Sequence, residues 1–426
     1  MTHSDLNPNL QGVPQSATLS INQRSIALQA EGRTIYRFGL GQSPFPVPEI
    51  VVTALKAHAA EKDYLPVEGL PALRRAVAEF HQRVDGVNIQ PEGVLVGPGS
   101  KELMFLLQLA LDAHLVVPSP CWVSYGPQAR IIGRAVERIP TSFDERWRML
   151  PEALDQHCLT NPGPNRLLIL NYPGNPDGDT YTESELDALA TVARKHGLIV
   201  LSDEIYSLTH HTNNHVSMAR FYPEGTIISG GLSKWCGAGG WRLGTMAFPQ
   251  ELQWLQTAIA AAASETYTSV SAPVQYAAIT AFEGGSEIDN YLAHTQRILL
   301  HLGEEITRRL QATGIAMHAP VGAFYLWLDC SAFAAKLASH GVTDSPTLCE
   351  RLLADTGVAI LPGAAFERPP EELTARLAYV DFDGAKAIEQ SRAIGLEKPI
   401  SSADLQECCG RVLDGIDALC DWLKNL

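Results

Sequence analysis

The sequence predicts an α/β fold in which helices cover a mostly parallel central sheet. Short apolar runs alternate with helical patterns through the middle of the chain, which is typical of such sheets. The chain has 426 residues, enough to bury a large core and to form two domains. Hydrophobic residues make up 46% of the chain and charged residues 19%, as expected for a globular protein.

Polar residues follow each predicted strand. Ligands of open α/β sheets bind at the edge where the carboxyl ends of parallel strands meet. We therefore expect the segments that follow these strands to line one pocket. The predicted strands and following segments are 94–96 before 97–101 and a leucine-rich helix over 102–112, 167–170 before 171–176, 198–201 before 202–206, and 226–229 before a glycine-rich segment around Lys234.

The glycine-rich segment, residues 229–244, reads SGGLSKWCGAGGWRLG. Glycine lets the backbone approach a ligand closely, and a cation near Lys234 would favour the neutral, nucleophilic amine. Arg242 offers a planar fork that suits phosphate oxygens. Together these residues indicate a lysine bound covalently to a phosphorylated aldehyde. For a lysine considered alone, a surface position on a flexible loop is the alternative.

This segment resembles the Schiff-base lysine motif of fold type I pyridoxal-phosphate (PLP) enzymes, the class I/II aminotransferases, in which S-x-S-K precedes G-W-R-x-G. Family members commonly have a phosphate-binding serine three residues before the lysine, where this chain has Gly231. One phosphate hydrogen bond must therefore be lost or replaced. The matching residues are Ser233, Lys234, Gly240, Trp241, Arg242 and Gly244.

The resemblance extends over about residues 19–379 with its motifs in family order. It implies a PLP-dependent aminotransferase, which moves an amino group from an L-amino acid to a 2-oxo acid through a Schiff base on Lys234. It also implies a large PLP-binding domain over residues 47–298 and a smaller α/β domain built from residues 1–46 and 299–426. A PLP-dependent carbon–sulfur lyase or a related amino-acid-modifying enzyme is the alternative. A non-catalytic PLP-binding regulator is disfavoured because the site residues are intact.

A phosphate cradle is predicted at the start of the helix that follows the first strand. Free backbone N–H groups and the helix dipole attract anions at such a position. The resemblance assigns cofactor contacts to Ser100, Lys101, Ser233 and Arg242. Trp122 falls where the family places an aromatic ring against the cofactor's pyridine. Ordinary core packing is the alternative for Trp122 alone.

Two later motifs complete the predicted cofactor site. The stretch NYPGNPDG over 171–178 resembles the family's N-P-x-N-P-T-G, which implies that the Asn175 amide contacts the cofactor's phenolic oxygen. The stretch DEIY supplies Asp203 and Tyr206. A buried carboxylate beside the ring nitrogen keeps that nitrogen protonated and makes the ring an electron sink. The resemblance places the Tyr206 hydroxyl on the phenolic oxygen.

Three further matches concern a second subunit and the substrate. Tyr64 matches the tyrosine that reaches the phosphate of the neighbouring subunit, which implies a homodimer. Arg376 matches the arginine that binds the substrate carboxylate and orients the Cα–H bond, and Gly41 would line the same pocket. For Arg376 alone, a solvated surface charge is the alternative.

The substrate's side chain is less constrained. Aspartate-specific relatives often supply a second arginine from the arm near residues 263–272, but no lysine or arginine occurs between Leu243 and Gln296. This absence slightly favours neutral or aromatic amino acids. A dicarboxylate could still be held by Arg33 or Arg37.

The composition limits other partners. A net charge of −15 argues against nucleic acid or an anionic membrane surface. The N-terminus lacks the apolar core of a secretory signal, and no apolar run is long enough to span a membrane. We therefore expect a cytoplasmic protein whose partners are small molecules and a second copy of the chain.

No metal is expected. The eight cysteines are scattered without metal-ligand spacing, and the adjacent Cys408 and Cys409 are expected on a helix rather than in a bridge. His210, His211 and His215 lie close together in sequence, and we expect a solvated loop there in preference to a metal site. The region 381–400 looks longer than the family needs, and no function is assigned to it.

Overall fold

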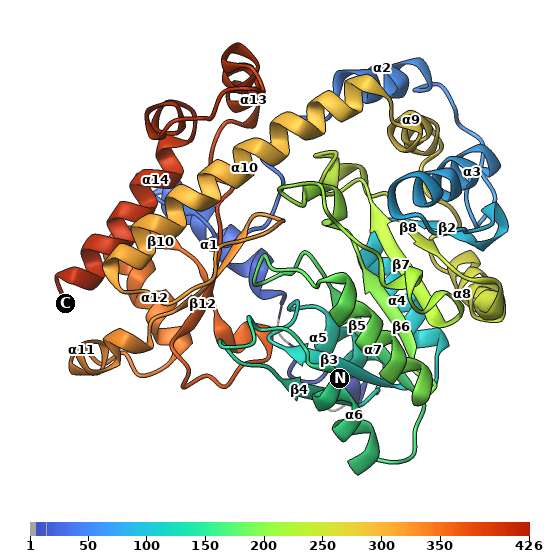
Figure 1. Cartoon of the computed structure of the whole chain (residues 1–426), viewed down its shortest axis with the longest axis horizontal. Coiled ribbons are helices and arrows are strands. Elements are labelled where there is room, and N and C mark those ends of the chain that lie inside the picture. The colour runs from blue at the N-terminus through green and yellow to red at the C-terminus, as the bar shows by residue number, and fades with distance from the viewer. Residues whose placement is uncertain (1–5, 14) are drawn as a thin grey trace.

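The computed structural model describes residues 6–13 and 15–426 and confirms the predicted α/β fold (Figure 1). Within these residues the central sheet has seven strands in the order β2-β8-β7-β6-β5-β3-β4. Only β8 runs antiparallel to its neighbours, so the sheet is mostly parallel, as predicted. Its strands are β2 (Val94–Gly97), β3 (His114–Ser119), β4 (Val136–Pro140), β5 (Arg166–Asn171), β6 (Ile199–Asp203), β7 (Thr226–Gly231) and β8 (Gly244–Ala247).

The carboxyl ends of the central strands lie level with one another. Asn171 at the end of β5 pairs with Asp203 at the end of β6, and Asp203 pairs with Ser229 on β7. Farther along the edge, Gly244 on β8 pairs with both Gly97 and Gly231. The register therefore brings the motifs that follow β2, β5, β6 and β7 to one edge of the sheet.

Two small sheets lie apart from the central one. They share a hydrophobic core with the C-terminal half of α10 (Ser286–Thr313) and with α14 (Ser402–Lys424), whereas the central sheet packs in separate clusters. Figure 1 shows α10 running from the side of the central sheet to the side of the small sheets. The small sheets are β1 (Tyr36–Arg37) with β10 (Val358–Ala359), and β11 (Leu361–Pro362), β12 (Thr374–Ala378) and β9 (Tyr325–Asp329) in that order.

Helices cover the sheets because their apolar residues face the strands. Four pairs of helices pack against each other around the central sheet: α2 (Glu49–Ala57) with α9 (Ala272–Glu283), α3 (Pro71–Phe80) with α9, α4 (Ser100–Ala110) with α8 (Gln253–Ser264), and α6 (Pro151–Thr160) with α7 (Glu183–Lys195). The other α-helices of the described residues are α1 (Ala17–Ala30), α5 (Tyr125–Ile131), α11 (Ala334–Ser339), α12 (Ser345–Thr356) and α13 (Gly384–Ile394).

The structure tests two predictions that the sequence makes about helices. The helix predicted over 102–112 is α4, which begins two residues earlier because Gly99 provides its N-cap. Cys408 and Cys409 lie on α14, as expected, and both are free thiols. Most of the region 381–400 is α13, which packs against α10 and α14. Among the described residues, no helix combines the length and apolar character needed to cross a membrane.

Candidate active site

Lys234 lies just after β7, at the carboxyl edge of the central sheet. Its half-buried side chain donates a hydrogen bond from Nζ to the Gly41 carbonyl at 2.8 Å. Burial and the nearby Arg376 guanidinium lower the pKa of Lys234 to about 8. A neutral amine is therefore accessible near neutral pH, which suits a lysine that acts as a nucleophile or a base.

Asp203 ends β6 and is almost completely buried. The Tyr125 hydroxyl donates a hydrogen bond to Asp203 Oδ2 at 2.5 Å, whereas Oδ1 has no hydrogen-bond partner. Burial raises the pKa of Asp203 to about 6, although the Tyr125 hydrogen bond opposes this shift. A buried carboxylate with one free oxygen is an acceptor for a cationic N–H group of a ligand.

Arg376 on β12 is 1% exposed, so the surface-charge alternative is wrong. Its Nη1 donates to Asn175 Oδ1 at 3.1 Å and its Nη2 donates to the Gly39 carbonyl, while Nε has no partner. The guanidinium carbon lies 4.7 Å from the centre of the Tyr325 ring. Two predicted residues that are 201 positions apart, Asn175 and Arg376, therefore meet directly.

Tyr206 and Tyr325 form a pair of buried hydroxyls beside Lys234. Their oxygens lie 2.7 Å apart, and Lys234 Nζ lies 5.5 Å from the centre of the Tyr206 ring. A Cβ atom at Gly41 would lie 1.9 Å from the Tyr325 hydroxyl, so only glycine fits at this position. Gly41 thus brings its carbonyl to Lys234 and leaves room for Tyr325.

The start of α4 and Arg242 form an anion cradle. Ser100 and Lys101 are the first two residues of α4, where backbone N–H groups lack partners within the helix. Arg242 Nη2 donates to the Pro98 carbonyl at 3.3 Å. A Cβ atom at Gly99, where φ is +93°, would lie 2.2 Å from this same Nη2. The glycine therefore lets the arginine reach the helix start.

The structure gives a reason for Gly231. Its φ is +146°, and a Cβ atom there would lie 2.7 Å from the Leu243 carbonyl oxygen. A serine would require β7 and the segment before β8 to move apart. Ser233, two residues later on the same segment, is half-buried.

Trp122 lies between the anion cradle and the buried carboxylate. Its ring packs edge-on against Tyr125, which holds Asp203, and Lys101 Nζ lies 5.0 Å from the centre of the Trp122 ring. Burial and then Arg242 lower the pKa of Lys101. Trp122 is half-buried, so part of its surface is open to a ligand.

Tyr64 differs from these residues because its side chain is exposed to solvent. Its side chain is 90% exposed, the most exposed of the large hydrophobic side chains within the described residues. The single chain therefore does not bring Tyr64 into a buried site.

The expectation for the three histidines is wrong. His210 is 3% and His211 is 6% exposed, and only 5% of the His215 side chain is accessible. His211 Nε2 lies 3.1 Å from the Ala323 carbonyl, and His215 Nε2 lies 2.8 Å from Glu204 Oε2. Local composition suggested a solvated loop, but these polar partners allow the rings to be buried.

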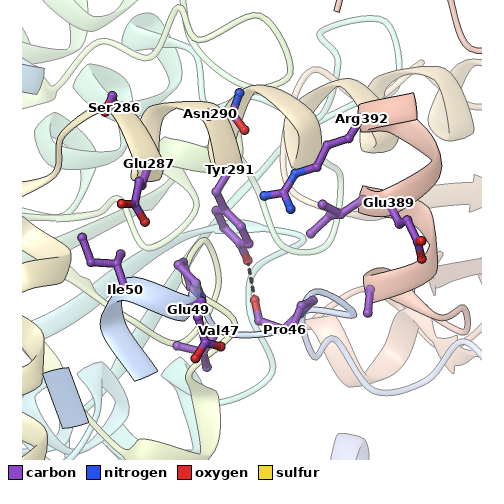
Figure 2. Close-up of a pocket in the computed structure, with 13 residues that line it drawn as sticks. Pro46, Val47, Glu49, Ile50, Ser286, Glu287, Asn290, Tyr291, Glu389 and Arg392 are labelled. Atoms are coloured by element: carbon purple, nitrogen blue, oxygen red, sulfur yellow. Dashed lines mark hydrogen bonds between the residues drawn. The ribbon is translucent and has the colours of Figure 1, made fainter. Parts of the chain in front are cut away.

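The cavity shown in Figure 2 lies elsewhere, between α2, α10 and α13, and has a volume of about 770 Å³. Tyr291 donates a hydrogen bond there to the Pro46 carbonyl at 3.0 Å. Three glutamates, at 49, 287 and 389, line it with a single arginine, Arg392. This acidic lining is unsuited to an anionic cofactor, so we place no active site in it.

The residues at the sheet edge fit PLP. The free Oδ1 of Asp203 suits a protonated ring nitrogen, and the cradle of α4 and Arg242 suits a phosphate. Lys234 supplies an amine of lowered pKa for an aldehyde. Fold and site together therefore define a lysine-dependent PLP enzyme.

The comparisons with known proteins identify the family. The family described as aminotransferase class I and II matches residues 33–380. The chain belongs to this family and is a PLP-dependent aminotransferase, which confirms the function and cofactor that the motifs predicted.

Its relatives agree with this assignment over most of the chain. An aspartate aminotransferase from Geobacillus stearothermophilus is 32% identical over 373 residues, covering 85% of this chain and 91% of the relative. An aspartate/prephenate aminotransferase from Thermus thermophilus is 31% identical over 366 residues, covering 85% and 91%. The solved structure of the Thermus thermophilus aspartate aminotransferase with maleate superposes with a TM-score of 0.84 at 28% identity, covering 98% and 99%.

Sequence reasoning missed Tyr125 and Tyr325. Each contacts a predicted residue through its hydroxyl, Tyr125 on Asp203 and Tyr325 on Tyr206. Tyr125 follows Trp122 by three residues, and this spacing at the start of α5 was the available signal. Tyr325 is the first residue of a buried strand, β9, which gives no local sign of a role.

Proposed function

We propose that this aminotransferase uses aspartate, or a dicarboxylic amino acid of similar length, as amino donor to a 2-oxo acid. The observation that carries the proposal is that relatives at 30% identity or more, matched over 85% of the chain, are named aspartate or aspartate/prephenate aminotransferases. The proposal replaces the slight preference for neutral or aromatic amino donors that the sequence indicated. That preference rested only on the absence of a lysine or arginine between Leu243 and Gln296.

Lys101 is the cation best suited to the second carboxylate. Arg376, Lys101 and Arg242 all lower the pKa of Lys234, so the site holds three cations whose charges disfavour the protonated amine. Arg242 lies at the anion cradle and Arg376 lies beside Asn175. Lys101 Nζ, over the Trp122 ring, is left for a substrate carboxylate and can also contribute to the phosphate field.

Arg376 would bind and orient the α-carboxylate. Its Nε lacks a partner, and its position is fixed by Asn175, the Gly39 carbonyl and the Tyr325 ring. A guanidinium held on several sides can bind a carboxylate with two parallel hydrogen bonds and little loss of freedom. Fixing this end of the substrate directs its Cα–H bond toward Lys234.

Lys234 would hold the cofactor and then move the proton. When bound, PLP supplies an electron sink for the bonds at the substrate's Cα. Once released by the incoming amine, Lys234 Nζ takes the proton from Cα, and its lowered pKa suits this role. Asp203 Oδ1 would accept a hydrogen bond from the ring nitrogen, while Asn175 and Tyr206 would contact the phenolic oxygen. Trp122 would lie against the ring.

Ser100, Ser233 and Arg242 would bind the phosphate, together with Tyr64 from a second copy of the chain. The exposure of Tyr64 supports this, because an apolar ring open to water is a candidate for burial by a partner. We therefore infer a homodimer, and the cytoplasmic location that the sequence predicts is kept as part of this proposal. Sedimentation across a dilution series should show a dimer, and a monomer of full activity would contradict the role of Tyr64.

The proposed domains are a large one over residues 47–298 and a small one from 1–46 and 299–426. Most of the core around the central sheet is separate from the core around the small sheets, which supports this division, while Ile205, Tyr206 and Tyr291 join the small-sheet core across the proposed junction. The Tyr291–Pro46 hydrogen bond and the cavity in Figure 2 lie near the proposed junction.

Steady-state kinetics with a saturating 2-oxo acid test the donor. We expect the highest kcat/KM for L-aspartate, and we expect Lys101→Met to lower it by about 10- to 100-fold, because a hydrogen bond to a charged group contributes ~1.5–3 kcal/mol. The kcat/KM for phenylalanine should change much less. The exposed Lys195, which pairs with Asp155, supplies the control Lys195→Met.

Other outcomes would redirect the proposal. Equal losses for aspartate and phenylalanine would place Lys101 on the cofactor phosphate alone. Release of pyruvate and ammonia without an added 2-oxo acid would indicate a lyase.

A further inference from the structure

Glu204 lies between two residues that are proposed to contact the cofactor. Asp203, which ends β6, comes directly before it, and Tyr206 comes two residues after it. The Glu204 N–H donates to the Ser229 carbonyl on β7 at 2.9 Å, and the Glu204 carbonyl accepts from the Ser207 N–H at 2.9 Å. The chain therefore leaves the sheet and begins to turn at Glu204.

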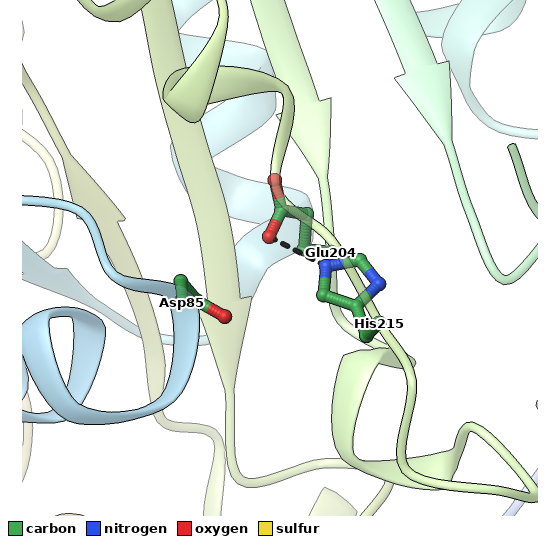
Figure 3. Close-up of side chains that lie close together, drawn as sticks. All are labelled: Asp85, Glu204 and His215. Atoms are coloured by element: carbon green, nitrogen blue, oxygen red, sulfur yellow. Dashed lines mark hydrogen bonds and ion pairs between the residues drawn. The ribbon is translucent and has the colours of Figure 1, made fainter. Parts of the chain in front are cut away.

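The Glu204 side chain is anchored by several segments. It is 4% exposed, and the hydroxyls of Ser202 and Ser217 each donate to its Oε1 at 2.7 Å. His215 Nε2 lies 2.8 Å from its Oε2 (Figure 3). The His215 ring stacks on Tyr172, with 5.4 Å between the ring centres. Residues from the end of β5, from β6 and from the loop before β7 therefore hold this one carboxylate in place.

Glu204 and His215 form a charged pair. Burial alone would raise the pKa of Glu204, but the charge and hydrogen bond of His215 and the two serine hydroxyls keep it below its ordinary value. Burial would lower the pKa of His215, but Glu204 raises it. Asp85 approaches the same pair (Figure 3), and its own partner is His81, whose Nδ1 lies 2.7 Å from Asp85 Oδ2. Glu204 is thus fixed by charge as well as by hydrogen bonds.

Asp203 is held from both faces of the sheet. Side chains alternate between the faces of a strand, and Ser202 and Glu204 meet on one face, so Asp203 between them points to the other. On that other face its carboxylate accepts from the Tyr125 hydroxyl at 2.5 Å. Its backbone carbonyl accepts from Asn171 Nδ2 at 2.8 Å. Glu204 supplies the anchor on the face away from the proposed cofactor contact.

We propose that Glu204, paired with His215, is a positioning residue that holds Asp203 at the cofactor's ring nitrogen and Tyr206 at its phenolic oxygen. Glu204 acts through these two neighbours, because its own side chain lies on the opposite face. Placement matters at such contacts, since a shift of ~1 Å can cost ~100-fold in rate. The inference rests on the roles proposed above for Asp203 and Tyr206.

The test is PLP retention by Glu204→Gln, which keeps the shape of the side chain and removes its charge. The PLP-loaded enzyme is dialysed against a series of PLP concentrations, and bound PLP is measured by absorbance. We expect the PLP dissociation constant to rise by about tenfold, because a charge-assisted contact is weakened. With saturating PLP, kcat should fall by about 10- to 100-fold with little change in the KM of the amino donor, which Arg376 sets.

Glu137→Gln is the matched control. It makes the same substitution in a partly buried carboxylate of the same sheet that also pairs with imidazoles, those of His114 and His157. Both variants should melt at a lower temperature than the wild type, but only Glu204→Gln should bind PLP more weakly. A purely structural role for Glu204 would lower the melting temperature alone.

Ser217→Ala is a milder variant for the case in which Glu204→Gln does not fold. It removes one donor to Glu204 and leaves the pair with His215. We expect the PLP dissociation constant to rise by about 2- to 5-fold. An unchanged constant in this variant would then contradict the proposal.

Two results with folded Glu204→Gln would overturn the proposal: a PLP dissociation constant and a kcat equal to those of the wild type, or an equal loss of PLP affinity in Glu137→Gln. Asp203→Asn shows which inference has failed. If Asp203→Asn binds PLP as the wild type does, the role proposed for Asp203 is wrong as well. If it loses affinity while Glu204→Gln does not, only the positioning role of Glu204 is wrong.

Discussion

Asp203 and Glu137 are acidic residues of the same sheet, but their carboxylates differ in how many partners they have. Asp203 ends β6, has one hydrogen-bond donor and keeps one oxygen free. Glu137 lies on β4 and contacts His114, His157 and Arg166 at 2.6, 2.7 and 2.8 Å. Burial raises the pKa of both groups, and it prevails for Asp203, which reaches about 6. For Glu137, the hydrogen bonds from His157, Arg166 and His114 prevail and lower the pKa to about 2.

The difference separates a carboxylate arranged for a ligand from one arranged for stability. A saturated carboxylate stabilises the fold, and a partly paired one costs stability until a partner arrives. Lys234 at the sheet edge and Arg376 on β12 are two nearby cations of the same site, and burial is the first cause that lowers the pKa of each. Groups that bind a ligand but destabilise the protein when the ligand is absent therefore mark the site.

Lys234→Ala should give the largest effect on activity. It removes both the amine that holds the cofactor and the base, and a positioned base alone typically contributes ~100- to 10,000-fold. The fold should persist, because the change removes a cation that burial and Arg376 disfavour. Turnover and thermal melting of the same preparation measure the two quantities. Normal turnover would show that the reaction does not need Lys234.

Asp203→Asn should separate activity from stability. We expect turnover to fall by about 200- to 5,000-fold, because breaking a buried ion pair costs ~3–5 kcal/mol. The melting temperature of the cofactor-free variant at pH 7 should equal or exceed that of the wild type. The folded-state pKa is raised, so the stability contributed by the protonated form is present below the unfolded pKa near 3.8 and is lost as pH rises through about 6. A much less stable variant would contradict this reasoning.

Glu137→Gln should lower stability and leave activity nearly unchanged, which is the reverse of the result expected for Asp203→Asn. It should lower the free energy of unfolding by about 1–3 kcal/mol, since it leaves the buried Arg166 and the partly exposed His114 and His157 poorly paired, and kcat of the folded enzyme should change little. The folded-state pKa of Glu137 is depressed, so its stabilisation is present above pH 4.5 and is lost as pH falls toward 2. Urea unfolding at pH 7 and pH 3 should therefore show a smaller difference between wild type and variant at pH 3.

Tyr325→Phe should give the smallest effect. It removes the hydroxyl that lies 2.7 Å from Tyr206 and keeps the ring under Arg376. A neutral hydrogen bond contributes ~0.5–1.5 kcal/mol, so we expect a change of about 2- to 10-fold in kcat with little change in KM. Tyr206→Phe is the matched control, and an effect from Tyr325→Phe as large as that from Lys234→Ala would mean that Tyr325 takes part in the chemistry.

The sequence predicted the parts of the site that follow strands. Lys234 and Asn175 come shortly after β7 and β5, and Asp203 is the last residue of β6, where parallel pairing aligns the strand ends. The position of residues in such short motifs is set by the strand end beside them, and ligands bind at that edge of the sheet. The domain limits and the roles of these residues stay predictions.

The sequence could not predict contacts made between distant segments. Tyr125 reaches Asp203 across 78 positions, and Tyr325 reaches Tyr206 across 119. His211 and His215 looked solvated because their partners, the Ala323 carbonyl and Glu204, are supplied by the fold. The constraint on Gly231 likewise depends on how β7 packs beside the segment before β8.

The most direct test of the central claim is a single half-reaction with the PLP-loaded enzyme. L-aspartate is added without a 2-oxo acid, and the absorbance of the cofactor and the oxo acid released are followed together. We predict conversion of the cofactor to its pyridoxamine form with one equivalent of oxaloacetate per site, and no conversion in Lys234→Ala. Release of ammonia with an unchanged cofactor, or no reaction with aspartate while phenylalanine reacts, would contradict it.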